Sequence, residues 1–171
     1  DYLVHYAFEG NGNDSGPSGL HGTINGTRST VSGVSGNALY FDNANMDLPN
    51  HASLAFGAGN SFTVSLWFKS AVVTTSLDSL GVVSTFKAAA TKSWGIFLPD
   101  NLSNATGRFY IGITDGTNGV SSTVPQRVDD DRWHHVTLVR DTTAARVRFY
   151  VDNVQTHDVA DTSGAINNGQ A

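Results

Sequence analysis

The chain lacks cysteine, and no apolar stretch approaches the roughly 20 residues that a membrane-spanning helix needs. Without cysteine it can form neither disulfides nor thiolate metal sites, and without a long apolar stretch we expect no membrane insertion. Basic residues are also few, because 10 Lys and Arg stand against 15 Asp and Glu, which gives a net charge of −5. Such a chain offers no attraction for the phosphates of a nucleic acid, so we expect no nucleic-acid partner.

Straight-chain helix formers are scarce, whereas Gly, Thr, Ser, Asn and Val are frequent, and this composition favours short strands and turns. The length of 171 residues suits one domain, so we predict a single domain over residues 1–171. Strand-like runs separated by Gly, Asn, Asp and Ser clusters recur along the chain, which is typical of an antiparallel sandwich. The predicted strands cover residues 3–8, 38–41, 62–70, 81–87, 93–98, 108–114, 134–141 and 145–151. We find no convincing amphipathic helix.

Three of these runs alternate between apolar and other residues, so each should turn one face to a core. The alternation leaves Trp67, Tyr110 and Tyr150 pointing away from that core. The residues predicted to point inward are Phe62, Val64, Leu66, Phe68, Phe109, Ile111, Ile113, Val147, Phe149 and Val151.

The connections differ in length. Residues 141–145 are predicted to join two neighbouring antiparallel strands, and residues 88–92 to form a hairpin turn. Residues 10–36 are predicted to form a long polar loop, and a loop of this length in a compact domain usually has a function.

Five motifs follow one another in a recognisable order. They are YAFEGNGNDSG from Tyr6, HG from His21, GNALYFD from Gly36, FTVSLW from Phe62, and WHHVTLVR from Trp133 followed by FYVD from Phe149. Their order resembles the laminin-G-like jelly-roll family of the concanavalin A-like lectin/glucanase superfamily. The resemblance implies an all-β fold of two stacked antiparallel sheets, one of them concave. It also implies a secreted or cell-surface protein that binds carbohydrate or other partners, and in many members a structural calcium.

One departure from the family concerns the end of the chain. Members usually close with a further strand similar to Ile-Asp-Asp-Val-Arg-Ile-Tyr, and no such strand precedes Ala171. Because an unpaired sheet edge is a liability, we expect the closing strand to come from a second chain, a swapped copy or a cleaved remainder of the precursor. Asp1 is not a starting Met and no leader precedes it, which also indicates a processed or excised piece.

Oxygen donors crowd into a Gly-punctuated segment near the start of the chain. The predicted metal ligands are Glu9, Asn11, Asn13 and Asp14. Carboxylate, amide and backbone oxygens suit Ca²⁺, although the spacing is not that of an EF-hand. The alternative is a polar turn in which Asn and Asp cap their own backbone.

Catalysis of the glucanase type is not expected. Glu9 is the sole glutamate, whereas the superfamily's glucanases use two or three Glu on one strand, and glycoside hydrolysis needs a carboxylate pair. The consecutive residues Asp129, Asp130 and Asp131 cannot share one strand face, so they are predicted to form a turn. No His spacing demands zinc, and of His134 and His135 one should be buried and hydrogen-bonded.

Sugar binding would use aromatic faces that stack on sugar rings and planar polar groups that bond to hydroxyls. The residues that could share the concave face, if their strands are neighbours, are Trp67, Tyr110, Arg146, Arg148, Tyr150 and Asp152. Trp67 and Tyr150 could instead simply line the groove or be covered by a loop. The resemblance also implies a rival location, because members of the family place ligands at the loop edge beside the metal, here Asp42, Asn43, Asn45 and Asp47.

The leading hypothesis is a non-catalytic, calcium-binding, carbohydrate-binding domain, such as part of an adhesin or a module of a polysaccharide-degrading enzyme. A protein-interaction or spacer domain without sugar binding is the alternative. A lyase or hydrolase that uses Asp, Arg, His and Tyr is the third hypothesis.

Overall fold

The structure is a computed structural model that describes residues 2–71, 80–85, 92–98 and 107–167. The chain divides into two compact units, residues 1–54 and residues 55–170, here called the N-terminal unit and the sandwich unit. The prediction of a single domain stays a prediction. Among the described residues, no helix has the length and apolarity to cross a membrane.

The N-terminal unit is built on a two-stranded antiparallel sheet. Its strands are β1 (Thr23–Ser32) and β2 (Asn37–Asp47), and a short 3₁₀ turn follows at Ala52–Leu54. The bulge between Asn25 and Thr27 shifts the register of the pair. Ahead of the hairpin, a single bridge joins Tyr6 to Asp14.

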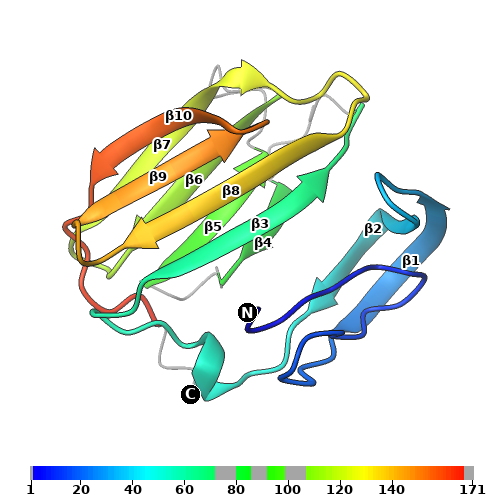
Figure 1. The fold of residues 1–171 in the computed structure, drawn as a ribbon, viewed down its shortest axis with the longest axis horizontal. Helices are drawn as coiled ribbons and strands as arrows, with labels where there is room; N and C mark the ends of the chain where they lie inside the picture. The colour runs from blue at the N-terminus through cyan, green and yellow to red at the C-terminus, as the bar shows by residue number, and fades with distance from the viewer. Residues whose placement is uncertain (1, 72–79, 86–91, 99–106, 168–171) are drawn as a thin grey trace. The chain divides into compact units, whose positions relative to one another are not determined.

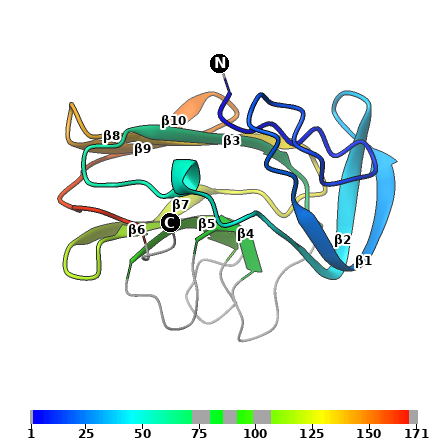
Figure 2. The same ribbon diagram turned by 90° about the horizontal axis from the view of Figure 1, so that it is seen from below.

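The sandwich unit contains two four-stranded antiparallel sheets, with the strand orders β10-β9-β8-β3 and β4-β5-β6-β7 (Figure 1). Figure 2 shows the two sheets as separate layers. The strands are β3 (Phe62–Phe68), β4 (Leu80–Ser84), β5 (Ser93–Leu98), β6 (Arg108–Thr114), β7 (Gly119–Arg127), β8 (His134–Asp141), β9 (Arg146–Val151) and β10 (Val154–Ala160). The predicted all-β sandwich of two antiparallel sheets is therefore confirmed.

The core lies between the two sheets and comes from every second residue of their strands. Phe109 on β6 and Phe149 on β9 are fully buried and meet edge to face with ring centroids 6.0 Å apart. Burial of such a side chain contributes about 1.5–3 kcal/mol. The inward face predicted from the alternation is confirmed, since Phe109, Ile111, Ile113, Val147, Phe149 and Val151 are buried and Phe62, Val64, Leu66 and Phe68 pack against them.

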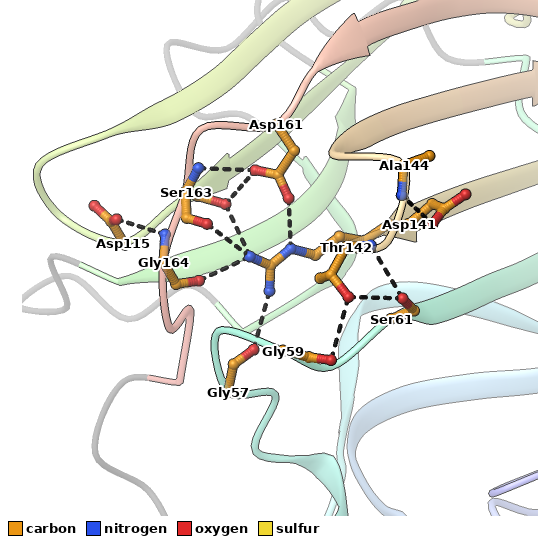
Figure 3. Close-up of polar contacts among 11 residues, drawn as sticks. Gly57, Gly59, Ser61, Asp115, Asp141, Thr142, Ala144, Asp161, Ser163 and Gly164 are labelled. Carbon is orange, nitrogen blue, oxygen red and sulfur yellow. Dashed lines mark hydrogen bonds and ion pairs between the residues drawn. The ribbon is translucent and has the colours of Figure 1, made fainter.

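A buried arginine ties together the segments that enter and leave the sandwich (Figure 3). The Arg140 guanidinium donates from Nε to Asp161 Oδ2 at 2.7 Å, and it also donates to the backbone oxygens of Gly57, Ser163 and Gly164. Its side chain is fully buried and that of Asp161 nearly so. Because β8 carries Arg140, these bonds fix the chain before β3 and after β10 to the same end of the sheet.

Several strand predictions need correction. Residues 3–8 were predicted as a strand but form only the Tyr6 bridge, because the N–H of His5 donates to the Asp14 carboxylate and the His5 carbonyl accepts from the N–H of Ser15. The predicted loop over residues 10–36 contains β1, whose side chains are nearly all exposed and therefore show no apolar alternation. Strands β7 and β10 were not predicted either, because each has few apolar residues among its Ser, Thr, Gln, His and Asp residues. Part of the predicted strand 81–87 and most of the turn 88–92 lie outside the described residues.

Candidate functional site

The outer face of the sheet β10-β9-β8-β3, here called the polar face, carries the side chains that alternate with the core residues. Each row of this face runs across neighbouring strands in register. One row contains Ser65, Thr137, Tyr150 and Gln155, and the next contains Trp67 and His135. Four strands therefore bring aromatic and polar groups onto one surface.

Trp67 is a large hydrophobic side chain on the polar face, and it is 51% exposed. Its ring lies beside that of His135, with centroids 5.0 Å apart and planes tilted by 50°. His135 Nε2 is 2.8 Å from Ser65 Oγ, which fixes the imidazole. An indole held in this way offers an open apolar face next to hydrogen-bonding groups, the combination that sugar rings require.

Tyr150 stands two residues along β9 from Arg148, and its hydroxyl donates to Gln155 Oε1 at 2.9 Å. Trp67 and Tyr150 sit on strands separated by β8, so they are about 10 Å apart across the sheet. That spacing exceeds the width of one sugar ring. The two aromatic side chains could therefore contact different units of an oligosaccharide.

The charges of the polar face are paired. Arg146 Nε is 2.6 Å from Asp158 Oδ1, and Arg148 Nη1 is 3.1 Å from Asp141 Oδ2. The hydrogen bond from Arg146 is the main cause that lowers the pKa of Asp158. The pKa of Asp141 is also lowered, mainly by the hydrogen bond from the backbone N–H of Ala144 and next by the bond from Arg148. Both carboxylates are therefore ionised near neutral pH and stay bonded to their guanidinium groups.

Asp152 lies in the turn between β9 and β10, where it has a positive φ of 51°. Its carboxylate accepts from His135 N at 2.9 Å and lies 2.8 Å from His134 Nδ1, while His134 Nε2 is 3.0 Å from Asp130. Burial would lower the pKa of His134, but the bonds and charges of Asp152 and Asp130 outweigh it and raise the pKa above the ordinary 6.5. The expectation that one of His134 and His135 is buried and hydrogen-bonded is confirmed for His134. The Asp152 carboxylate is occupied by its bonds to the His134 ring and the His135 backbone.

Tyr110 does not share the polar face. It lies on β6 in the opposite sheet, where it is 36% exposed and its ring is 6.4 Å from that of Phe97. The condition that its strand neighbours those of Trp67 and Tyr150 is thus not met, because β6 pairs with β5 and β7. Of the predicted ligand residues, Trp67, Arg146, Arg148 and Tyr150 gather on one face, Asp152 lies at its end, and Tyr110 is separate.

Glu9, the first predicted calcium ligand, reaches the turn between β1 and β2. Its carboxylate accepts from the backbone N–H of Asn37 at 3.1 Å and from Asn37 Nδ2 at 2.8 Å. Gly36 has a φ of 67°, and a Cβ there would overlap the Glu9 carboxylate. Glu9 therefore anchors the first segment of the chain to the hairpin.

Asp14 has a similar role within its own loop. Oδ1 accepts from the backbone N–H groups of His5 at 2.8 Å and Gly16 at 2.7 Å, and Oδ2 accepts from Leu20 at 3.0 Å. The N–H of His5 is the main cause that lowers the pKa of Asp14, although burial acts in the opposite direction. Asn11 Oδ1 accepts from the N–H of Asn13 at 2.9 Å, the self-capping arrangement of a polar turn.

The four oxygen donors have the right chemistry for calcium, yet the carboxylates of Glu9 and Asp14 accept N–H groups from separate parts of the N-terminal unit. Within the described ranges, no three His, Asp or Glu side chains gather as metal ligands. Calcium binding by Glu9, Asn11, Asn13 and Asp14 stays a prediction.

The rival loop edge is also held by internal bonds. Asp47 accepts from Asn25 Nδ2 at 2.9 Å and from Asn45 Nδ2 at 2.7 Å. Asn43 has a positive φ of 49° next to the bulge of β1. These contacts explain the polar composition of the segment without a ligand.

Sequence reasoning missed several members of the polar face, namely Ser65, His135, Thr137, Asp141, Gln155 and Asp158. The alternation of residues 62–69 and 134–141 contains the signal for the first four. The last two could not be found, because β10 was not predicted.

Comparisons with known proteins agree with this fold. A family model described as the concanavalin A-like lectin/glucanases superfamily matches residues 41–171, more than half of the chain. The chain is similar to domain 4 of AbnA, an extracellular GH43 arabinanase from Geobacillus stearothermophilus, whose structure was solved in complex with arabinotriose. The TM-score is 0.70 and the identity is 18%, and the match covers 98% of this chain and 78% of that chain. None of the curated proteins compared with the chain matches it.

Two further solved structures share the fold at low identity. The binding domain of Paraclostridial mosquitocidal protein 1 has a TM-score of 0.70 and 14% identity, over 92% of this chain. The present chain spans 40% of that protein's chain. Domains LG4-5 of the mouse laminin alpha1 chain have a TM-score of 0.50 and 14% identity, over 65% of this chain and 26% of that chain.

Proposed function

Because this chain belongs to the concanavalin A-like lectin/glucanases superfamily, we propose that it is a non-catalytic carbohydrate-binding domain that binds an oligo- or polysaccharide on the polar face. The observation that carries the proposal is the exposed Trp67 beside the ordered polar side chains of β8 and β9. A similar fold in the arabinanase domain was solved with arabinotriose, which supports a sugar ligand.

A non-catalytic role is favoured by the roles of the carboxylates. Glycoside hydrolysis requires one carboxyl group free to donate a proton and a second free to act as base or nucleophile. On the polar face, Asp158 is bonded to Arg146, and Asp141 is bonded to the N–H of Ala144 and to Arg148, so neither carboxyl group is free. The sole glutamate, Glu9, bonds to the hairpin turn of the N-terminal unit. Binding without cleavage is the function that these groups can support.

We extend the proposal to a secreted or cell-surface protein, in which the domain attaches its parent to a glycan. The similarity to a domain of an extracellular arabinanase supports this context. Calcium is part of the proposal as a stabiliser of the loop at Glu9, Asn11, Asn13 and Asp14, supported by the oxygen-rich composition of that loop.

The test is a glycan array probed with the wild-type chain and two matched aromatic variants. Trp67→Ala removes the exposed indole of the polar face, and Tyr110→Ala removes a half-exposed phenol of the opposite sheet. We expect the wild type and Tyr110→Ala to bind the same glycans and Trp67→Ala to lose at least about tenfold in affinity, the value of a stacking contact of about 1.4 kcal/mol.

Three other results would contradict the proposal. Loss of binding in Tyr110→Ala alone would place the ligand on the opposite sheet. A folded wild type that binds no glycan would favour the alternative of a protein-interaction or spacer domain. Release of reducing ends from a polysaccharide panel would contradict the non-catalytic assignment.

A further inference from the structure

The ion pairs of the polar face restrict the charge of its ligand. Arg146 and Arg148 lie on the polar face, and Lys69 directly follows β3 at its border. Each has a carboxylate partner: Lys69 Nζ is 3.2 Å from Asp131, Arg146 bonds to Asp158, and Arg148 bonds to Asp141. The formal charge of these six groups is therefore zero.

The pairing of the two arginines is reinforced by shared contacts. Asp158 Oδ1 lies 2.6 Å from Arg146 Nε and 3.6 Å from Arg148 Nε, so one carboxylate faces both guanidinium groups. Arg146 also donates from Nη2 to the backbone oxygen of Asp158 at 2.6 Å. The side chains are only a quarter to a third exposed, which reduces the screening of these pairs by water.

From this arrangement we infer that the polar face selects neutral glycans and rejects those that carry carboxylate or sulfate groups. The inference rests on the proposed carbohydrate-binding function. A neutral hydroxyl can donate to a carboxylate and accept from a guanidinium without disturbing their pairing. An anionic group could accept only from guanidinium N–H groups that the ion pairs leave free, and at that distance Asp141 and Asp158 would repel it.

The charge of the whole chain acts in the same direction. The net charge of −5 repels polyanions at long range, so no general attraction compensates for the paired face. Selection against acidic glycans then depends on the carboxylates and not on the aromatic residues. Trp67 and Tyr150 provide stacking surfaces that any sugar could use.

The experiment is affinity electrophoresis in gels that contain arabinan, galactan, polygalacturonate or heparin, at about 20 mM and about 200 mM NaCl, two concentrations that differ strongly in screening. The wild type is compared with Asp158→Asn, which frees positive charge on the face. Asp42→Asn makes the same charge change in the N-terminal unit and is the control. Trp67→Ala reports whether any retardation arises at the polar face.

We expect the wild type to be retarded by a neutral polysaccharide equally at both salt concentrations, and not by polygalacturonate or heparin. Asp158→Asn should gain at least about threefold in affinity for polygalacturonate at low salt, whereas Asp42→Asn should not. Salt-sensitive binding of the wild type to an acidic glycan, abolished by Trp67→Ala, would overturn the inference while leaving carbohydrate binding intact. The absence of any gain in Asp158→Asn would overturn its charge argument, and failure to bind all four polysaccharides would count against the proposed function itself.

Discussion

Replacement of Arg140 by Met tests whether one buried guanidinium holds the end of the sandwich together. Arg140 is fully buried, pairs with Asp161 at 2.7 Å and donates to three backbone oxygens. Removal of one partner from a buried ion pair typically costs about 3–5 kcal/mol, because the other charge is left buried without compensation. A domain of this size has a total stability of only about 5–15 kcal/mol. The variant should therefore be close to the limit of folding.

Urea unfolding followed by tryptophan fluorescence measures the loss of stability in the sandwich unit, because that unit contains all three tryptophans, Trp67, Trp94 and Trp133. With a urea dependence of about 2 kcal/mol per molar, a loss of about 4 kcal/mol lowers the midpoint by about 2 M. Arg148→Met removes the partner of a more exposed pair and should change the midpoint little. Equal small shifts in the two variants would refute the role given to Arg140.

Three further predictions concern pH, the hairpin anchor and calcium. The pKa of His134 is raised in the folded protein, so the stability that its charged form contributes should be complete below pH 6.5 and be lost as pH rises through the folded pKa. The difference in urea midpoint between wild type and His134→Gln should therefore shrink from pH 5.5 to pH 8.5. A difference that stays constant over this range would contradict the prediction. Glu9→Gln keeps the size of the side chain but weakens it as a hydrogen-bond acceptor, so it should accelerate hydrogen exchange of the Asn37 backbone amide at least about threefold. Unchanged exchange would show that the Glu9 carboxylate does not anchor the hairpin. If calcium binds the loop, chelation should lower the melting temperature and Asp14→Asn should abolish that response, whereas a melting temperature unaffected by chelator would reject calcium.

Much of the sandwich could be predicted because several of its strands, such as β6 and β8, alternate strictly. The runs at residues 93–98, 108–114 and 134–141 coincide with β5, β6 and β8. Their inner faces must be apolar since both neighbours in the sheet and the opposite layer exclude water. Strands β1, β7 and β10 carry few apolar residues, and β7 even contains Pro125, which an edge strand tolerates. No local pattern could reveal them.

The candidate site was predictable to the extent that it depends on alternation within a strand. Trp67, Arg148 and Tyr150 were correctly assigned to outward faces, but the sequence does not say which strands are neighbours. Tyr110 alternates as regularly as Tyr150 and still lies on the other sheet. The ion pairs of the polar face depend on the pairing of β9 with β8 and with β10, which is a tertiary property. For Glu9 and Asp14, composition identified the acidic loop but not the N–H groups that its carboxylates accept.

The central claim is that a sugar binds on the outer face of the sheet β10-β9-β8-β3. The most direct measurement is a map of backbone amide chemical-shift changes during titration with a neutral oligosaccharide, taken from the polysaccharide that retards the wild type. We expect changes along β3, β8 and β9, concentrated near Trp67, His135 and Tyr150, and their loss in Trp67→Ala. Changes concentrated near Phe97 and Tyr110, or in the loop of Glu9 and Asp14, would contradict it.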